Sequence, residues 1–188
     1  MEEKFSALSE IYTAFERETA PFREAAACTR GCAFCCAEAG SIDVVTLEGL
    51  AIGNAIARMP RPRQRALQKA VEKDVRGRQQ GLRSPCPFLL KNATCAVYPV
   101  RPFPCRRIFS LHRCSRERPP VIHRKVMERS EEAIRTLRRL DDTGYAGHIS
   151  AVLLLLADPD FLSVYRSGDF RPERVAAYGK RHGMRINR

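Results

Sequence analysis

Eight cysteines are the residues of this 188-residue chain whose chemistry is most distinctive. Four of them lie in "CTRGCAFCC", and the other four are spread over a later segment. Thiolates gathered in this way bind zinc or hold iron-sulfur clusters. Cysteines used only as small hydrophobes would be scattered over buried helix faces. We therefore predict that all eight are metal ligands: Cys28, Cys32, Cys35, Cys36, Cys86, Cys95, Cys105 and Cys114.

Cys35 and Cys36 are neighbours in the chain. Adjacent side chains diverge in most backbone conformations, so we predict that the two serve different metal ions or that only one is a direct ligand. Two four-thiolate sites would use all eight cysteines. "CTRGCAFC" is similar to the cluster-binding loop of radical S-adenosylmethionine enzymes, but the barrel of those enzymes has no counterpart here. The spacing leaves an iron-sulfur cluster and zinc both open.

The start of the chain indicates the compartment. "MEEKFSALSE" carries acids where a signal peptide is basic, and no long apolar stretch follows it, so we expect a cytoplasmic protein. Disulfides are rare in that compartment, which favours metal-bound thiolates over a secreted disulfide scaffold. The longest apolar run, "AVLLLLA", is far shorter than the roughly 20 residues of a membrane span. We expect no membrane association.

Basic residues stand close to the later cysteines. Four thiolates around Zn²⁺ leave a net charge of about −2, which a buried site must offset. We predict that Arg101 and Arg106 lie beside the thiolates, lower their pKa values and donate hydrogen bonds to sulfur. His112, two residues before Cys114, is an alternative ligand, although a surface or packing histidine is the more ordinary interpretation.

The formal net charge of +12 is unevenly distributed. Residues 1–50 contain 4 basic and 9 acidic side chains, whereas residues 101–140 contain twelve basic residues and four glutamates. This pattern predicts a basic surface for an anionic partner, either an acidic protein or a nucleic acid. The alternative is solvated helix faces beside a negatively charged metal site.

Helical periodicity covers most of the chain outside the cysteines. The pattern that begins at Phe5 predicts a helix ending before Pro21, and Thr46 is the expected N-cap of a second helix. Two short apolar runs, "PFLL" and "CAVY", indicate a small hairpin between residues 83 and 114. The other expected helices cover about residues 62–80 and 121–140, "HISAVLLLLA", "PDFLSVYRSG" and "RPERVAAYGKRHG".

These elements predict a mainly α fold. We expect one domain over residues 1–188, in which helices surround an irregular, loop-rich cysteine metal centre with at most a small β-hairpin. The metal-binding core covers about residues 28–114, and the C-terminal helical part covers about residues 119–188.

"CTRGCAFCC", "CPFL" and "CAVYPVRPFPCR", in this order, resemble the YkgJ-type CxxCxxCC cysteine-cluster family. The resemblance runs from Cys28 to about Arg107 and implies zinc or iron chelation by the cysteines. Three residues separate Cys28 from Cys32 where the family pattern has two, which makes Cys28 the least secure ligand. Cys114 lies beyond the second motif.

Three functions follow from these observations. The first is a metal-binding protein whose cysteine centre organises loops for a partner. The second is an iron-sulfur oxidoreductase or a protein-modifying enzyme of the methyl-transfer type, since a related cluster domain occurs in flagellin lysine N-methylase. The third is a nucleic-acid binder, although the chain has no zinc-finger spacing and no aromatic RNA-binding motif. We favour the first, and the sequence names no catalytic residue.

Overall fold

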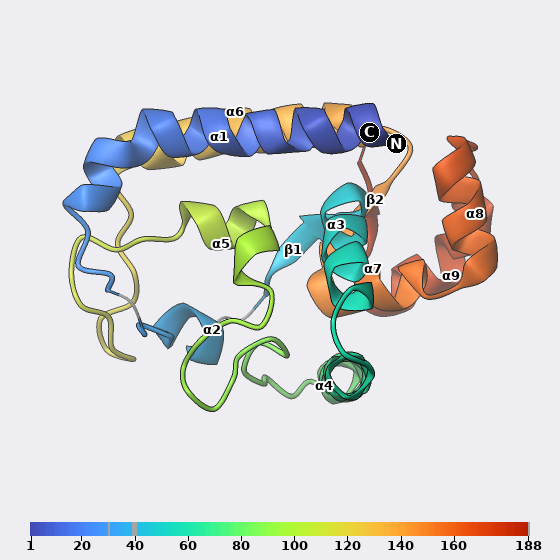
Figure 1. Cartoon of the computed structure of the whole chain (residues 1–188), viewed down its shortest axis with the longest axis horizontal. Helices are drawn as coiled ribbons and strands as arrows, with labels where there is room; N and C mark the ends of the chain where they lie inside the picture. Colours follow the sequence, from blue (N-terminus) through green and yellow to red (C-terminus); the bar gives the residue numbers. More distant parts are fainter. Residues whose placement is uncertain (30, 39–40, 188) are drawn as a thin grey trace.

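The computed structural model of the chain describes residues 1–29, 31–38 and 41–187. It confirms the prediction of a mainly helical protein with little β-structure (Figure 1). In chain order the elements of the described residues are α1 (Glu2–Glu24), α2 (Phe34–Glu38), β1 (Asp43–Val45), α3 (Thr46–Ala57), α4 (Arg61–Gln79), the 3-10 turn η1 (Tyr98–Val100), α5 (Phe103–Arg107), α6 (Arg124–Leu140), β2 (Tyr145–His148), α7 (Ile149–Leu156), α8 (Pro159–Ser167), α9 (Pro172–His182) and β3 (Arg185–Ile186).

The two long helices α1 and α6 lie side by side along one edge of the molecule (Figure 1). Leu8 and Phe15 of α1 and Val126 and Leu137 of α6 are buried against each other. Phe103, at the start of α5, completes this core and packs edge-to-face against Phe15, with ring centroids 4.8 Å apart. The apolar stripe predicted for each helix therefore faces the other helix and α5.

A second core joins α3, α4 and α7 to the later cysteine segment. Ile52, Val71 and Val152 are buried in it together with Phe88 and Val97 from the loops around the cysteines. Gly49 of α3 packs against α7, because a Cβ at this position would lie 2.5 Å from the Val152 side chain. The loops that carry the later cysteines pack on this core of α3, α4 and α7.

The sheet is small and antiparallel, with strand order β1-β2-β3. Asp43 pairs with His148 and Val45 with Ala146, while Tyr145 pairs with Ile186. Thr46, at the start of α3, accepts a hydrogen bond from Tyr145 N and donates one to Tyr145 O. The sheet thus connects the segment after the first cysteine box, residues 28–36, to the C-terminal part of the chain.

The first helix is longer than predicted. We expected it to end before Pro21, and this is wrong, because α1 continues through that residue. Proline removes one backbone hydrogen bond from a helix interior. Tertiary contacts hold the final turn nevertheless: Phe22 stacks on His123 at 4.4 Å between centroids, and Arg23 donates to the Arg106 carbonyl at 2.7 Å.

Other local predictions also change. The N-cap of α3 is Val45, and Thr46 is the first helical residue; its hydroxyl does not cap the helix because it is hydrogen-bonded to the backbone of Tyr145 in β2. The hairpin predicted from "PFLL" and "CAVY" is a single antiparallel bridge between Leu89 and Cys95. "HISAVLLLLA" begins with the last residue of β2 before α7 starts.

No helix in the described part of the chain is long and apolar enough to cross a membrane.

Candidate metal centre

The first cysteine box begins where α1 ends. Ala27 N donates a hydrogen bond to Ser110 O at 2.8 Å, and Ser110 N donates to the sulfur of Cys28 at 3.3 Å. A turn follows in which Cys32 N donates to Thr29 O at 3.0 Å. Arg30 lies outside the described residues. The box is thereby held beside the segment that leads to Cys114.

Cys35 and Cys36 are not in an irregular loop, as predicted, but in the short helix α2. Successive residues of an α-helix are about 100° apart around its axis, so the two thiols leave α2 in different directions. Cys86 N donates to Cys36 O at 2.7 Å. Cys36 therefore lies against the second cysteine segment, whereas Cys35 does not share this contact.

Burial and mutual proximity define an inner group of thiols: Cys36, Cys86, Cys95 and Cys105. The last three pack against the hydrophobic core that α3, α4 and α7 form. Burial and, to a smaller extent, the nearby thiols of Cys36 and Cys95 raise the pKa of Cys86 to about 12. Burial also raises the pKa of Cys105, with contributions from the other three inner thiols.

An outer group comprises Cys28, Cys32, Cys35 and Cys114. Burial raises the pKa of Cys35 to about 12, and the thiols of Cys28 and Cys114 are the next causes, followed by Cys36 and Cys32. Cys28 and Cys32 are exposed, unlike every member of the inner group. Cys36 is also affected by Cys32, so the two groups meet at α2.

The thiols gather without reaching coordination geometry. Within residues 1–29, 31–38 and 41–187, no three His, Cys, Asp or Glu side chains are placed so that they could hold one metal ion. All eight cysteines are free thiols. Each group nevertheless offers four sulfur donors, the set that suits zinc or an iron-sulfur cluster. The donor chemistry fits such a centre, and binding would require each group to draw together.

A comparison with protein families identifies the chain. The sequence model of the CxxCxxCC family, described as "Putative zinc- or iron-chelating domain", matches residues 27–132, more than half of the chain. The chain belongs to the CxxCxxCC family. No curated protein and no solved structure matches it. The family match confirms the resemblance seen in the sequence and extends beyond Arg107 to include Cys114.

The CxxCxxCC region places Cys114 on a loop that returns to α2. Arg116 bonds to Glu38 of α2 through two nitrogens, at 3.0 and 3.1 Å from the Oε1 atom. The ring of His112 does not lie free beside the thiols, because its Nε2 atom is 3.1 Å from the carbonyl oxygen of Pro119. The ion pair joins the Cys114 loop to the helix that carries Cys35.

The two arginines predicted beside the thiolates of the CxxCxxCC region are anchored by α1. Arg106 is only 8% exposed, and its guanidinium bonds to Glu16 at 2.7 Å and to the Arg101 carbonyl at 2.9 Å. Arg101 bonds to the same Glu16 at 3.0 Å and lies over the Tyr98 ring. The nearby charge of Arg101 opposes the effect of burial on the pKa of Cys95.

Glu48 is a site residue that the sequence analysis missed. It is 3% exposed and accepts hydrogen bonds from Tyr12 Oη and Phe103 N, both at 2.6 Å, and from Val45 N at 3.1 Å. Burial raises its pKa, which those hydrogen bonds oppose. Glu48 thus binds the N-terminus of α5, the helix that carries Cys105. The sequence carried no signal for it, because a capping box begins with Ser or Thr and Val45 occupies that position.

Asp74 of α4 is a second missed residue. It accepts hydrogen bonds from Ser150 Oγ at 2.7 Å, from Arg78 Nε at 3.0 Å and from the hydroxyl of Ser84. Ser84 lies two residues before Cys86. Asp74 therefore fixes the chain where it enters the inner thiol group.

A cavity of about 970 Å³ lies between the cysteine segments and the α1/α6 pair. Glu48, Phe103 and Arg107 are among its walls, as are Ile134 and Arg138. Seven of the eight thiols line it, namely Cys28, Cys32, Cys35, Cys36, Cys86, Cys95 and Cys105. Thiols of both groups therefore border one open cavity, and Cys114 is the one thiol outside its lining.

Proposed function

We propose that this chain holds two metal centres, one in each thiol group. The inner centre would use Cys36, Cys86, Cys95 and Cys105, and the outer centre would use Cys28, Cys32, Cys35 and Cys114. The observation that carries this assignment is the divergence of Cys35 and Cys36 on α2, one toward each group. Four thiolates per centre satisfy the coordination number of structural zinc and of iron-sulfur clusters.

The two centres would organise the loops that carry them. A bound metal contributes its binding free energy to folding, so loops with little regular structure become ordered when their thiolates share an ion. Arg101 and Arg106 would assist the inner centre by offsetting thiolate charge and by joining residues 98–107 to α1 through Glu16. Glu48 would assist by holding α5 in place.

Anaerobic purification followed by elemental analysis and absorption spectroscopy tests this proposal. Two zinc ions per chain and no colour would support a structural zinc protein. Iron with labile sulfide and a spectrum that bleaches on reduction would favour the iron-sulfur centre, and with it the alternative of an oxidoreductase or protein-modifying enzyme. A chain that retains neither metal, or a single ion lost from every cysteine variant alike, would contradict two separate centres.

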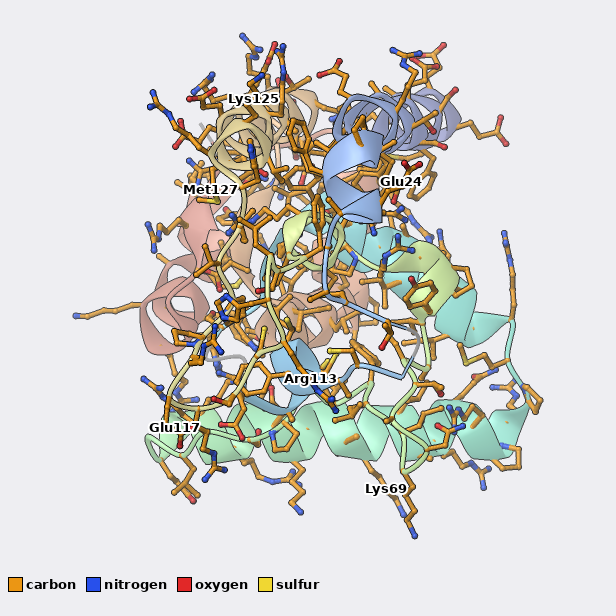
Figure 2. The ribbon with its side chains drawn as sticks, turned by 90° about the vertical axis from the view of Figure 1, so that its left-hand side faces the viewer. Glu24, Lys69, Arg113, Glu117, Lys125 and Met127 are labelled. Carbon is orange, nitrogen blue, oxygen red and sulfur yellow. The ribbon has the colours of Figure 1, made fainter. Side chains whose placement is uncertain are left out.

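A second function is favoured by the surface of α4, which we propose binds nucleic acid. Its basic side chains stand on the face opposite the buried Leu67, Val71 and Val75. Figure 2 shows Lys69 pointing away from the body of the molecule, below α4. The exposed residues of this basic stripe are Arg61, Arg65, Lys69, Lys73 and Arg76.

The basic stripe does not lie in residues 101–140, the segment from which the sequence predicted a basic surface. Several arginines of that later segment are paired with acids, as Arg116 is with Glu38 and Arg129 with Glu18. Within the described chain, no ion pair involves the five residues of the stripe. They extend over about 22 Å of helix at the usual rise of roughly 1.5 Å per residue. A phosphate backbone suits such a row of cations.

Binding of a fluorescent DNA duplex at several salt concentrations tests the stripe. Five phosphate contacts predict a slope of about −4.5 in a plot of log affinity against log salt. Replacing the five stripe residues by Gln should abolish this slope. A matched control replaces Arg124, Lys125, Arg135, Arg138 and Arg139 by Gln and removes the same charge from α6. Equal losses in both variants would contradict a specific role for α4.

A further inference from the structure

The helix α4 lies between the basic stripe and the inner thiol group. Two of its buried residues, Leu67 and Val71, belong to the hydrophobic core against which Cys86, Cys95 and Cys105 pack. The stripe is on the opposite side of the helix, along the lower edge of the molecule in Figure 2. One helix therefore has the inner thiols on its buried side and a row of cations on its exposed side.

Buried and exposed side chains alternate closely in the second half of α4. Val71 and Asp74 are buried, whereas Lys73 and Arg76, each two positions later, are exposed members of the stripe. Two positions correspond to about 200° around a helix axis, so each pair of side chains points in nearly opposite directions. A movement of the buried face relative to the core therefore also displaces the cations of this half of the helix.

Asp74 connects α4 directly to the chain that enters the inner thiol group. Its carboxylate is 3% exposed and accepts a hydrogen bond from the hydroxyl of Ser84, two residues before Cys86. Its other oxygen accepts a hydrogen bond from the hydroxyl of Ser150 in α7 at 2.7 Å. Cys86 N in turn donates to Cys36 O at 2.7 Å. The segment that carries Cys86 and the helix that carries the stripe are thus joined at one buried carboxylate.

Metal at the inner centre would fix this connection. Once Cys86 shares an ion with Cys36, Cys95 and Cys105, the segment between α4 and Cys86 is held at both ends, by the ion and by the Asp74 carboxylate. Without the ion, hydrogen bonds and core packing alone hold the segment. A surface that is already ordered binds its ligand more tightly, because less conformational entropy is lost on binding.

We propose that occupancy of the inner metal centre controls the affinity of the basic stripe for nucleic acid. The inference rests on both proposed functions, the metal centre and the nucleic-acid surface, and adds the coupling between them. Metal fixes the Cys86 segment, and Asp74 holds α4 to that segment. Lys73 and Arg76 are then held in line with the first three cations of the stripe. Loss of the metal loosens the contacts of these two cations with phosphate.

The direct electrostatic effect of a loaded centre has the opposite sign. Four thiolates and a divalent ion carry a net charge of about −2, which repels phosphate. The stripe is on the far side of a helix about 10 Å in diameter, close to the Debye length at about 0.1 M salt, so this repulsion is largely screened. Tighter binding of nucleic acid by the loaded chain would therefore come from order in α4 and not from charge.

Fluorescence anisotropy of a labelled DNA duplex tests the coupling on the full chain. We expect the metal-loaded chain to bind at least about fivefold more tightly than Cys86→Ser, with salt slopes of about −4.5 and about −2.7 for five and three phosphate contacts. Cys28→Ser, with its inner centre filled, is the matched control and should bind like the loaded chain. Cys28 is exposed and, among the described residues, is not part of the core of α4. Equal affinity of the wild-type chain and Cys86→Ser, or equal losses in both variants, would overturn the proposal.

Two serine variants that keep every cysteine locate the coupling at Asp74. Ser84→Ala removes the hydrogen bond toward Cys86, whereas Ser150→Ala removes a hydrogen bond toward α7 and leaves that link intact. Both variants should retain the full metal content. Ser84→Ala should weaken DNA binding by the loaded chain at least about threefold and lower its salt slope, and Ser150→Ala should change neither. Wild-type affinity in Ser84→Ala would overturn the proposal even where Cys86→Ser fails to fold.

Separate outcomes show which proposal fails. A chain that retains no metal would contradict the metal centres, and a loaded chain without salt-dependent DNA binding would contradict the stripe; either result also overturns the coupling. Metal retention and DNA binding that are both present but independent would overturn the coupling alone. Coupling is reciprocal, so a saturating duplex should raise the metal affinity of the inner centre by the same factor in competition with a chelator. An unchanged metal affinity would overturn the proposal.

Discussion

The inner and outer thiol groups contain four cysteines each but differ in their surroundings. The inner group lies against a hydrophobic core and receives support from Glu48, Asp74 and Arg106. The outer group consists of three loop cysteines, two of them exposed, and Cys35 of α2, and the one ion pair described for its Cys114 loop is on the surface. Two sets of four thiols can thus differ in how deeply they are buried and in how firmly the surrounding residues hold them. We expect the inner centre to be structural and the outer centre to exchange more readily.

The largest expected effect comes from removing one thiol of each group. Cys86→Ser should cost the protein its inner metal centre and at least about 3 kcal/mol of stability, a fall in melting temperature of roughly 10 °C for a chain of this size. Cys28→Ser should cost only the outer centre and lower the melting temperature by a few degrees. Elemental analysis and thermal unfolding measure both quantities. Equal destabilisation by the two variants would remove the distinction.

Chelator competition should separate the groups by rate. With excess chelator, the wild-type chain should release its metal in two phases, and the faster should be at least about tenfold quicker because exposed ligands are attacked more readily. The fast phase should be missing from Cys28→Ser and the slow phase from Cys86→Ser. A colorimetric zinc or iron indicator follows both phases. Single-phase release from the wild-type chain would contradict unequal centres.

Arg106→Gln should affect the inner group alone. It removes the hydrogen bond to Glu16, which keeps its ion pair with Arg101, and the hydrogen bonds to the carbonyl oxygens of Arg101 and Pro99; loss of such buried bonds typically costs about 1–3 kcal/mol. We expect faster release of the inner metal or a shifted cluster spectrum. Arg17→Gln, on the neighbour of Glu16 in α1, is the matched control, because Arg17 is exposed, does not line the thiol cavity and forms no ion pair with a described residue. Unchanged metal content, release rate and spectrum would remove Arg106 from the centre.

The smallest effect is expected from the surface ion pair of the outer group. Arg116 is 79% exposed at its side chain, and exposed ion pairs contribute about 0–1 kcal/mol. Arg116→Gln should therefore leave the melting temperature nearly unchanged while accelerating the fast phase of metal release by no more than a few-fold. A large loss of stability in this variant would show that the outer loop is a structural element comparable to the inner one.

Much of the helical framework could be predicted from the sequence because its signals are local. The apolar stripes of α1, α4 and α6 have helical period, and Pro62 and Gly81 mark the ends of α4 as expected. The sheet could not be predicted, since β2 and β3 are very short and owe their formation to pairing across more than 35 residues. The end of α1 was misplaced because contacts of Arg23 and Phe22 override Pro21.

The candidate site was predictable in its residues and not in its arrangement. Cysteine spacing selected the eight thiols as proposed donors, and the adjacency of Cys35 and Cys36 predicted that they serve different ions; both remain predictions. The grouping of Cys114 with the first box depends on a loop that returns to α2 through Arg116, a contact invisible in a linear pattern. Glu48 escaped notice because a glutamate in a helix is ordinarily a surface residue.

The short helix α2 has one more implication. It carries one ligand of each proposed centre on consecutive residues, so their Cα atoms are only about 3.8 Å apart. Filling one centre would immobilise the backbone on which the other must be assembled, and the second ion would then meet a partly ordered site. Under this assignment the two centres are expected to load cooperatively. Both need an ordered α2, so the metal affinity of each centre depends on whether the other is occupied.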